Sequence, residues 1–181
     1  MSDTLKPYSM ITDFVTGQQI PLVGAEENRQ MVERFLVNEK GYLKEDIEVD
    51  VDIEISAGGQ TYRSQIDLVV SVDDGATRFM AFKCAAASLG SREREILAAA
   101  RLLEENQIPL SVVSDGHTAI VLDTVSGRKQ GEGLEAIPSK EQARELLNNL
   151  VGQPLPEEKR ERESLIFRSY DSMNVNVGRN L

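Results

Sequence analysis

Two charged residues stand inside segments whose neighbours are apolar. Asp67 lies in the run 66–70 (IDLVV), and Lys83 lies in the run 79–84 (FMAFKC). Burying either charge alone costs several kcal/mol or shifts its pKa, so we expect the two side chains to compensate each other on neighbouring strands. Three interpretations stay open: a structural ion pair, a strand end where both groups reach water, or part of a chemical site.

Phosphodiester hydrolysis is the chemistry that this pair of residue types favours. A divalent metal held by carboxylates polarises the phosphate and activates water, while a nearby lysine stabilises charge or positions that water. Such a site needs an acid on one strand, then an acid and a lysine separated by one residue on the next, so that both face the same way. A glutamate on the first helix often completes the set.

Other residues with chemical potential have simpler interpretations. His117, the only histidine, follows an Asp-Gly turn, where exposed polar residues are normal. Cys84 is the only cysteine, so neither an intrachain disulfide nor a cysteine-built zinc site can form. The chain also lacks a Gly-rich phosphate loop and is too short to contain a helicase motor.

The elements that must position Asp67 and Lys83 follow from hydrophobic periodicity, turn residues and capping patterns. Gly41 predicts the end of a helix, Ser91 predicts a helix cap, and Ser139 with Gln142 has the spacing of a capping box. We expect helices over 25–40, 91–106, 139–151 and 157–168, and strands over 47–56, 61–72, 77–85, 109–114 and 118–123. This order predicts an α/β fold, a mixed sheet flanked by helices.

The strand expected over 47–56 alternates strictly between apolar and acidic residues. A half-buried strand with one apolar face and one solvated acidic face is the expected structure. The apolar face would consist of Val49, Val51, Ile53 and Ile55.

Several stretches, in order, resemble the PD-(D/E)XK nuclease superfamily, and more closely the N-terminal domain of type I restriction enzyme R subunits. The resemblance covers about residues 25–130. It is carried by the segments 26–30 (EENRQ), 35–37 (FLV), 65–69 (QIDLV), 79–87, 108–116 (IPLSVVSDG) and 121–124 (VLDT).

The resemblance implies a restriction-endonuclease-like fold and assigns roles to particular residues. Glu27 would be the helix acid, Asp67 the metal-binding aspartate and Lys83 the motif lysine. The second strand acid falls at position 81, where this chain has alanine. Relatives sometimes move that acid to the following helix, where Glu93 and Glu95 are the candidates. Glu95 is favoured as the third expected metal ligand, because it shares a helix face with Ala99.

The function implied is a DNA-associated endonuclease-like domain, Mg²⁺-dependent if active and expected to be impaired by Ala81. The alternative is a non-catalytic interaction or regulatory module that retains the fold, homodimeric through its C-terminal helix. Restriction-modification proteins are further expected partners. We divide the chain into an N-terminal extension (1–24), the domain (25–151), and a linker, C-terminal helix and polar tail (152–181).

Charge and hydropathy limit the setting. The formal net charge of −10 opposes broad contact with DNA, because phosphate binding depends on Lys and Arg, although a local basic cleft stays compatible with it. No apolar run approaches the roughly 20 residues that span a bilayer. We therefore expect a cytoplasmic protein without a membrane segment.

Overall fold

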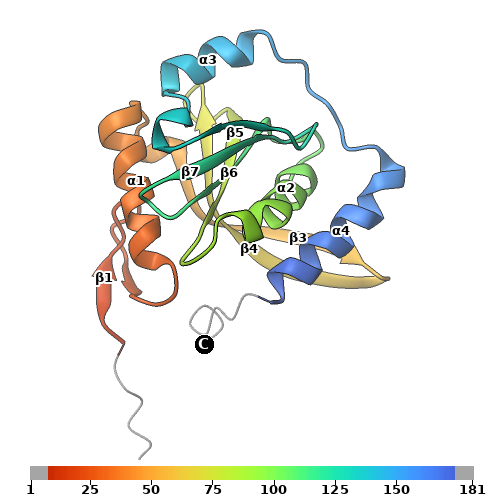
Figure 1. Ribbon diagram of the computed structural model, residues 1–181, viewed down its shortest axis with the longest axis horizontal. Coiled ribbons are helices and arrows are strands. Elements are labelled where there is room, and N and C mark those ends of the chain that lie inside the picture. Colours follow the sequence, from red (N-terminus) through yellow and green to blue (C-terminus); the bar gives the residue numbers. More distant parts are fainter. Residues whose placement is uncertain (1–7, 174–181) are drawn as a thin grey trace, which may run out of the picture.

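The computed structural model describes residues 8–173, which form a central six-stranded sheet between helices (Figure 1). The strand order is β3-β4-β5-β6-β7-β8, and every neighbouring pair is antiparallel except the parallel pair β5–β6. The expected mixed α/β architecture is confirmed. The strands are β3 (Ile47–Ala57), β4 (Gln60–Val72), β5 (Thr77–Cys84), β6 (Leu110–Ser114), β7 (Ala119–Asp123) and β8 (Lys129–Glu132).

Helices cover both faces of this sheet, and each face has its own apolar core (Figure 1). On one face, Val32 of α1 and Ala143 of α3 join Phe82 of β5 in a core. On the other, Ile96 of α2 and Phe167 of α4 join Val69 of β4. The helices are α1 (Glu26–Lys40), α2 (Glu93–Leu102), α3 (Lys140–Asn148) and α4 (Glu157–Asp171).

Helix α1 forms where its periodicity predicts. Val32 and Leu36, four residues apart on one face, are fully buried against the sheet. Gly41 ends the helix with a φ of 76°, and its N–H donates to the carbonyl of Leu36. Glycine adopts this left-handed conformation without the steric cost that a Cβ imposes.

Strand β3 departs from the expected single apolar face. Val49 packs against the α1 core, whereas Val51, Ile53 and Ile55 belong to the α2 core. The change of face occurs at Asp50, whose φ of 53° is left-handed and rotates the next side chain to the other side. Strict alternation of sequence letters cannot show such a break in the backbone.

Helix α2 begins later and ends earlier than expected. The segment Gly90–Arg92 is a 3₁₀ turn, and the α-helical cap position is occupied by Arg92. The expected capping role of Ser91 is therefore wrong: its hydroxyl donates instead to the carbonyl of Ser88, 2.8 Å away. The helix connects the parallel strands β5 and β6, as a crossover of this type requires.

Two strand pairings lie outside the sequence prediction. The N-terminal extension contains an antiparallel hairpin of β1 (Met10–Thr12) and β2 (Gln19–Pro21). Strand β8 extends the sheet beside β7. All three strands have three or four residues, too short for periodicity to distinguish them from loops.

The C-terminal helices begin as predicted. Ser139 and Gln142 form the capping box of α3. Helix α4 extends three residues beyond the expected end, and the rings of its Phe167 and of Tyr62 form a T-shaped pair with centroids 6.2 Å apart. The last part of the polar tail, 174–181, lies outside the described residues. Within 8–173, no helix is both long and apolar enough to cross a bilayer.

Candidate functional site

Asp67 and Lys83 meet on adjacent strands. The register pairs Val69 with Ala81 and Leu68 with Phe82, and its continuation places Asp67 opposite Lys83. The Lys83 Nζ lies 3.8 Å from the Asp67 Oδ2, and both side chains are buried. The expected proximity of these two groups is therefore present.

The backbone of β5 also holds Asp67 in place. The N–H of Cys84 donates to the Asp67 Oδ2 at 2.7 Å. A buried carboxylate that accepts a backbone hydrogen bond is fixed in position and partly compensated for its lost hydration. Asp67 is thus oriented by the strand that also carries Lys83.

Glu95 of α2 approaches Lys83 from the helix side. Its Oε1 lies 3.1 Å from the Lys83 Nζ, and its Oε2 lies 3.5 Å from Nη1 of Arg92. Burial raises the pKa of Glu95, while the positive charges of Lys83 and Arg92 oppose that rise. Two carboxylates and two cations therefore form a compact and nearly balanced charge network.

Position 81 supplies no ligand to this network. Ala81 is fully buried, lies on the same face as Lys83, and packs in the core that contains Val69 and Ile96. Among residues 8–173, no group of three or more His, Cys, Asp or Glu side chains is arranged to hold a metal ion. The described residues therefore do not fit the metal centre that the resemblance implies.

Helix α1 brings Glu26, rather than Glu27, into the interior. Glu27 is exposed, and within the described residues no hydrogen bond or ion pair joins it to Asp67, Lys83 or Glu95. Neighbouring positions on a helix point about 100° apart, so only one of two successive acids can face the sheet. The structure thus brings together Asp67, Lys83 and Glu95 but leaves Glu27 outside.

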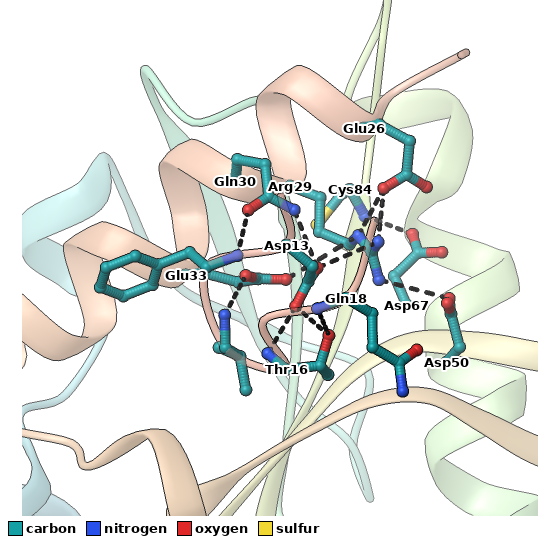
Figure 2. Close-up of polar contacts among 12 residues, drawn as sticks. Asp13, Thr16, Gln18, Glu26, Arg29, Gln30, Glu33, Asp50, Asp67 and Cys84 are labelled. Atoms are coloured by element: carbon teal, nitrogen blue, oxygen red, sulfur yellow. Dashed lines mark hydrogen bonds and ion pairs between the residues drawn. The ribbon is translucent and has the colours of Figure 1, made fainter. Parts of the chain in front are cut away.

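Glu26 belongs to a second cluster, centred on Arg29 of α1 (Figure 2). The Arg29 Nη2 lies 2.5 Å from Glu26 Oε2 and 3.3 Å from Asp13 Oδ2. Its Nη1 lies 3.4 Å from Asp50 Oδ1, and its Nε lies 3.9 Å from Glu33 Oε1. Arg29 itself is only 1% exposed, so one buried guanidinium faces four carboxyl groups.

The Arg29 cluster adjoins the Asp67–Lys83 pair through the sheet. The β3–β4 register pairs Val49 with Leu68 and Val51 with Ile66, which places Asp50 opposite Asp67. Asp50 holds its left-handed backbone conformation at this position. Strained backbone in non-glycine residues occurs more often at functional sites than elsewhere.

The same cluster fastens the N-terminal hairpin to α1. The Gln30 Oε1 accepts from the N–H of Phe14 at 2.7 Å, and the Gln30 Nε2 donates to Asp13 at 2.9 Å. The Glu33 Oε2 accepts from the N–H of Val15 at 3.2 Å. The loop between β1 and β2 is thus bound by polar side chains on one helix face.

The pKa values of Glu33 and Asp13, the two acids where the hairpin meets α1, shift in opposite directions. Burial raises the pKa of Glu33 to about 8, with a further rise from the charge of Asp13, while Arg29 opposes it. For Asp13, burial raises the pKa, but hydrogen bonds from Thr16 and Gln30 and the charge of Arg29 outweigh it, so the net pKa is lowered. At neutral pH Asp13 is ionised and Glu33 holds its proton.

Reasoning from the sequence missed Arg29, Asp13 and Glu33 as buried groups. The spacing of Glu26, Arg29 and Glu33 on one helix face was a usable signal, since residues three and four apart are neighbours. Such spacing is also usual on solvated helices, which is why it did not single them out.

Neither Cys84 nor His117 adds to the site. Cys84 is buried, and its burial raises the pKa of the thiol well above the ordinary value, which disfavours the reactive thiolate. His117 is exposed after the turn at Asp115 and Gly116, as expected, and its N–H donates to Asp115 at 2.8 Å.

The protein is an α/β domain of the restriction-endonuclease-like kind. Its mixed sheet is flanked by helices, and an acid and a lysine are buried side by side on adjacent strands of that sheet. The family described as type I restriction enzyme R protein N terminus matches residues 24–138, more than half of the chain. The protein belongs to that family. No curated protein and no solved structure gives a significant match.

The matched segment has a structural meaning. It begins just before α1 and ends just before α3, so it contains the sheet, α1 and α2, and with them Asp67, Lys83 and Glu95. The hairpin of β1 and β2 and the helices α3 and α4 lie outside it. Asp13, which helps to bind Arg29, therefore comes from outside the matched segment.

Proposed function

We propose that the protein is a DNA-associated, nuclease-like module of a restriction system in which metal-dependent hydrolysis is impaired. Membership of the restriction enzyme R family supports the association with DNA. The observation that carries the impairment is the buried Ala81, which stands where the family pattern needs an acid. Without that acid, the remaining carboxylates, Asp67 and Glu95, are both engaged with Lys83.

The charge network at Lys83 is compatible with holding a phosphate group rather than cleaving it. The Lys83 ammonium is a point charge that pairs readily with phosphate oxygens. A phosphate would have to displace Glu95, and burial already disfavours the ionised form of that carboxyl group. Binding of DNA here would thus be coupled to proton uptake by Glu95.

A Mg²⁺-dependent endonuclease is the second candidate. The convergence of Asp67, Glu95 and Lys83 favours it, since these are the residue types that such chemistry uses. In this candidate Asp67 and Glu95, with Glu27 added by a movement of α1, would hold the metal. We assign no reaction step to that metal, because the described residues do not form its ligand set.

Nicking of supercoiled DNA in Mn²⁺ separates the two candidates. Wild type and Lys83→Ala should both leave the DNA supercoiled if hydrolysis is impaired. Nicking by wild type that is lost in both Lys83→Ala and Asp67→Asn would establish the active nuclease instead. Loss of nicking in both variants excludes a contaminating nuclease, because neither substitution would change the activity of a contaminant.

Association with DNA is tested separately by fluorescence anisotropy of a labelled duplex, without metal, at two salt concentrations. We expect weak binding that falls between 50 and 200 mM salt, because phosphate contacts release counterions. With a net charge of −10, the contact must be local and the salt dependence shallow. No binding at low salt would refute the DNA-associated function.

We also propose partners other than DNA. Helix α4 already buries Phe167 and Ser164 within its own chain, so a homodimer through α4 would have to use its opposite face, where Leu165 is exposed. Restriction-modification subunits are the alternative partners. We place the protein in the cytoplasm, where such systems meet DNA.

A further inference from the structure

The Arg29 cluster contains more negative than positive groups. Four carboxyl groups, those of Asp13, Glu26, Glu33 and Asp50, approach one guanidinium that is almost fully buried (Figure 2). They come from three places: the β1–β2 loop, α1 and β3. Carboxylates gathered from separate elements repel one another unless a cation lies among them.

The Arg29 cluster lies beside the Asp67–Lys83 pair and gathers acids from a helix and a strand. Glu26 and Glu33 are the two buried acids of α1, and Asp50 lies opposite Asp67 on the neighbouring strand. A helix acid and strand acids are the oxygen ligands from which divalent cations are bound in proteins. Here the centre of the group is occupied by a side chain of the protein itself.

We propose that Arg29 is the resident cation of this cluster: its guanidinium neutralises the converging carboxylates, binds the N-terminal hairpin to α1, and excludes divalent metals. A guanidinium suits this role, since it stays charged at all relevant pH values and offers five donors in a planar fork. The proposal goes beyond the proposed function and does not depend on DNA binding. It also accounts for the finding that, among the described residues, the four carboxyl groups of this cluster form no metal centre.

The proposal is tested by Arg29→Gln, measured by thermal unfolding and by Mn²⁺ binding followed with electron paramagnetic resonance. Wild type should bind Mn²⁺ no tighter than an exposed carboxylate does. The variant should unfold at a lower temperature without metal, and millimolar Mn²⁺ should restore its Tm by on the order of 5 °C. Its Mn²⁺ affinity should exceed that of wild type at least tenfold.

Two controls separate this role from a loss of packing. Arg29→Lys keeps a positive charge and should gain no Mn²⁺ affinity. Arg101→Gln removes a different partly buried arginine, which pairs with Glu163 at 3.0 Å, so it should lower the Tm without any response to Mn²⁺. A Mn²⁺ response in Arg101→Gln as large as that of Arg29→Gln would overturn the proposal.

The folding of the Arg29 variants and the Mn²⁺ affinity of wild type also test the proposal. Arg29→Gln that unfolds in buffer but folds in Mn²⁺ supports the proposal. Failure to fold at any Mn²⁺ concentration, while Arg29→Lys folds, contradicts it. A Mn²⁺ site already present in wild type and lost in Glu26→Gln would show that the guanidinium does not exclude the metal.

Discussion

The Nζ of Lys83 lies 3.1 Å from a carboxylate oxygen of Glu95 and 3.8 Å from one of Asp67, so one buried ammonium serves two acids from different elements. Asp67 lies on β4 and Glu95 on α2, and Lys83 reaches both from β5, the strand paired with β4. Removing any one of the three leaves an imbalance in an environment with little water. Structural integrity and any activity of the site therefore depend on the same contacts.

Lys83→Met should destabilise the fold by about 3–5 kcal/mol, because Asp67 and Glu95 lose their shared cation while staying buried. Chemical denaturation measures this change. The double variant Lys83→Met with Glu95→Gln should recover part of the loss, since one of the two carboxylates that Lys83 paired with is then neutral. Lys129→Met, which removes an exposed lysine paired with Glu132, is the control and should leave the unfolding midpoint unchanged. Equal effects at both lysines would contradict a buried network at Lys83.

The geometry at Lys83 could be predicted from the sequence, whereas the geometry at Arg29 could not. Asp67 and Lys83 stand out because each interrupts an apolar strand, and the cost of burying a lone charge requires a partner. Arg29 sits among the polar residues of an amphipathic helix, where a charge raises no such conflict. What buries it is the hairpin of β1 and β2, whose three-residue strands leave no periodic pattern.

The left-handed backbone at Asp50 was beyond sequence reasoning for a related reason. Alternating letters predict a strand over 47–56, and β3 spans Ile47–Ala57. They do not reveal that one residue rotates the chain, so that Val49 and Val51 enter different cores. The alternating pattern of the sequence determines that this segment is a strand. The left-handed turn at Asp50 depends instead on how the strand packs against both faces of the sheet.

The Asp50 backbone conformation predicts an unusual order of variant stabilities. Asp50→Gly and Asp50→Ala both lose the contact with Arg29, but only glycine adopts a φ of 53° without strain. Asp50→Ala should therefore be the less stable of the two by roughly 0.5–1 kcal/mol, after the greater flexibility of unfolded glycine is counted. Urea unfolding measures the difference.

Asp52 provides the matched control for this comparison. It lies two residues along the same strand with an ordinary extended backbone, so Asp52→Gly should be less stable than Asp52→Ala. The two positions should thus show opposite orders. The same order at both would mean that the conformation at Asp50 carries no strain.

The raised pKa of Glu33 predicts that the stability of the fold depends on pH. Its folded-state pKa of about 8 lies above the ordinary value of 4.5. Between these two pH values, the Glu33 carboxyl group keeps its proton in the folded chain and has released it in the unfolded chain. Stability contributed by the protonated carboxyl group is complete below about pH 4.5 and is lost as the pH rises towards 8. The loss is at most about 1.4 kcal/mol per pH unit.

Comparison of wild type with Glu33→Gln isolates this effect. The glutamine keeps an oxygen for the N–H of Val15 and cannot ionise, so the variant should gain stability relative to wild type from pH 5 to pH 8. The difference should then become constant at higher pH. Thermal unfolding at half-unit pH steps gives the curve, and parallel curves for the two proteins would exclude a buried, titrating Glu33.

Ala81 allows the impaired-nuclease interpretation to be tested by restoration. Ala81→Glu places a third carboxyl group on the face of β5 that carries Lys83, beside Asp67 and Glu95. Position 81 is fully buried, so the larger side chain should lower the Tm by overpacking, and a divalent cation that binds the new acid should raise it again. Ala81→Gln has the same size without the charge and should be destabilised without any response to Mn²⁺. If Ala81→Glu and Ala81→Gln respond alike to Mn²⁺, or neither responds, the missing acid at position 81 is not what keeps this site from binding metal.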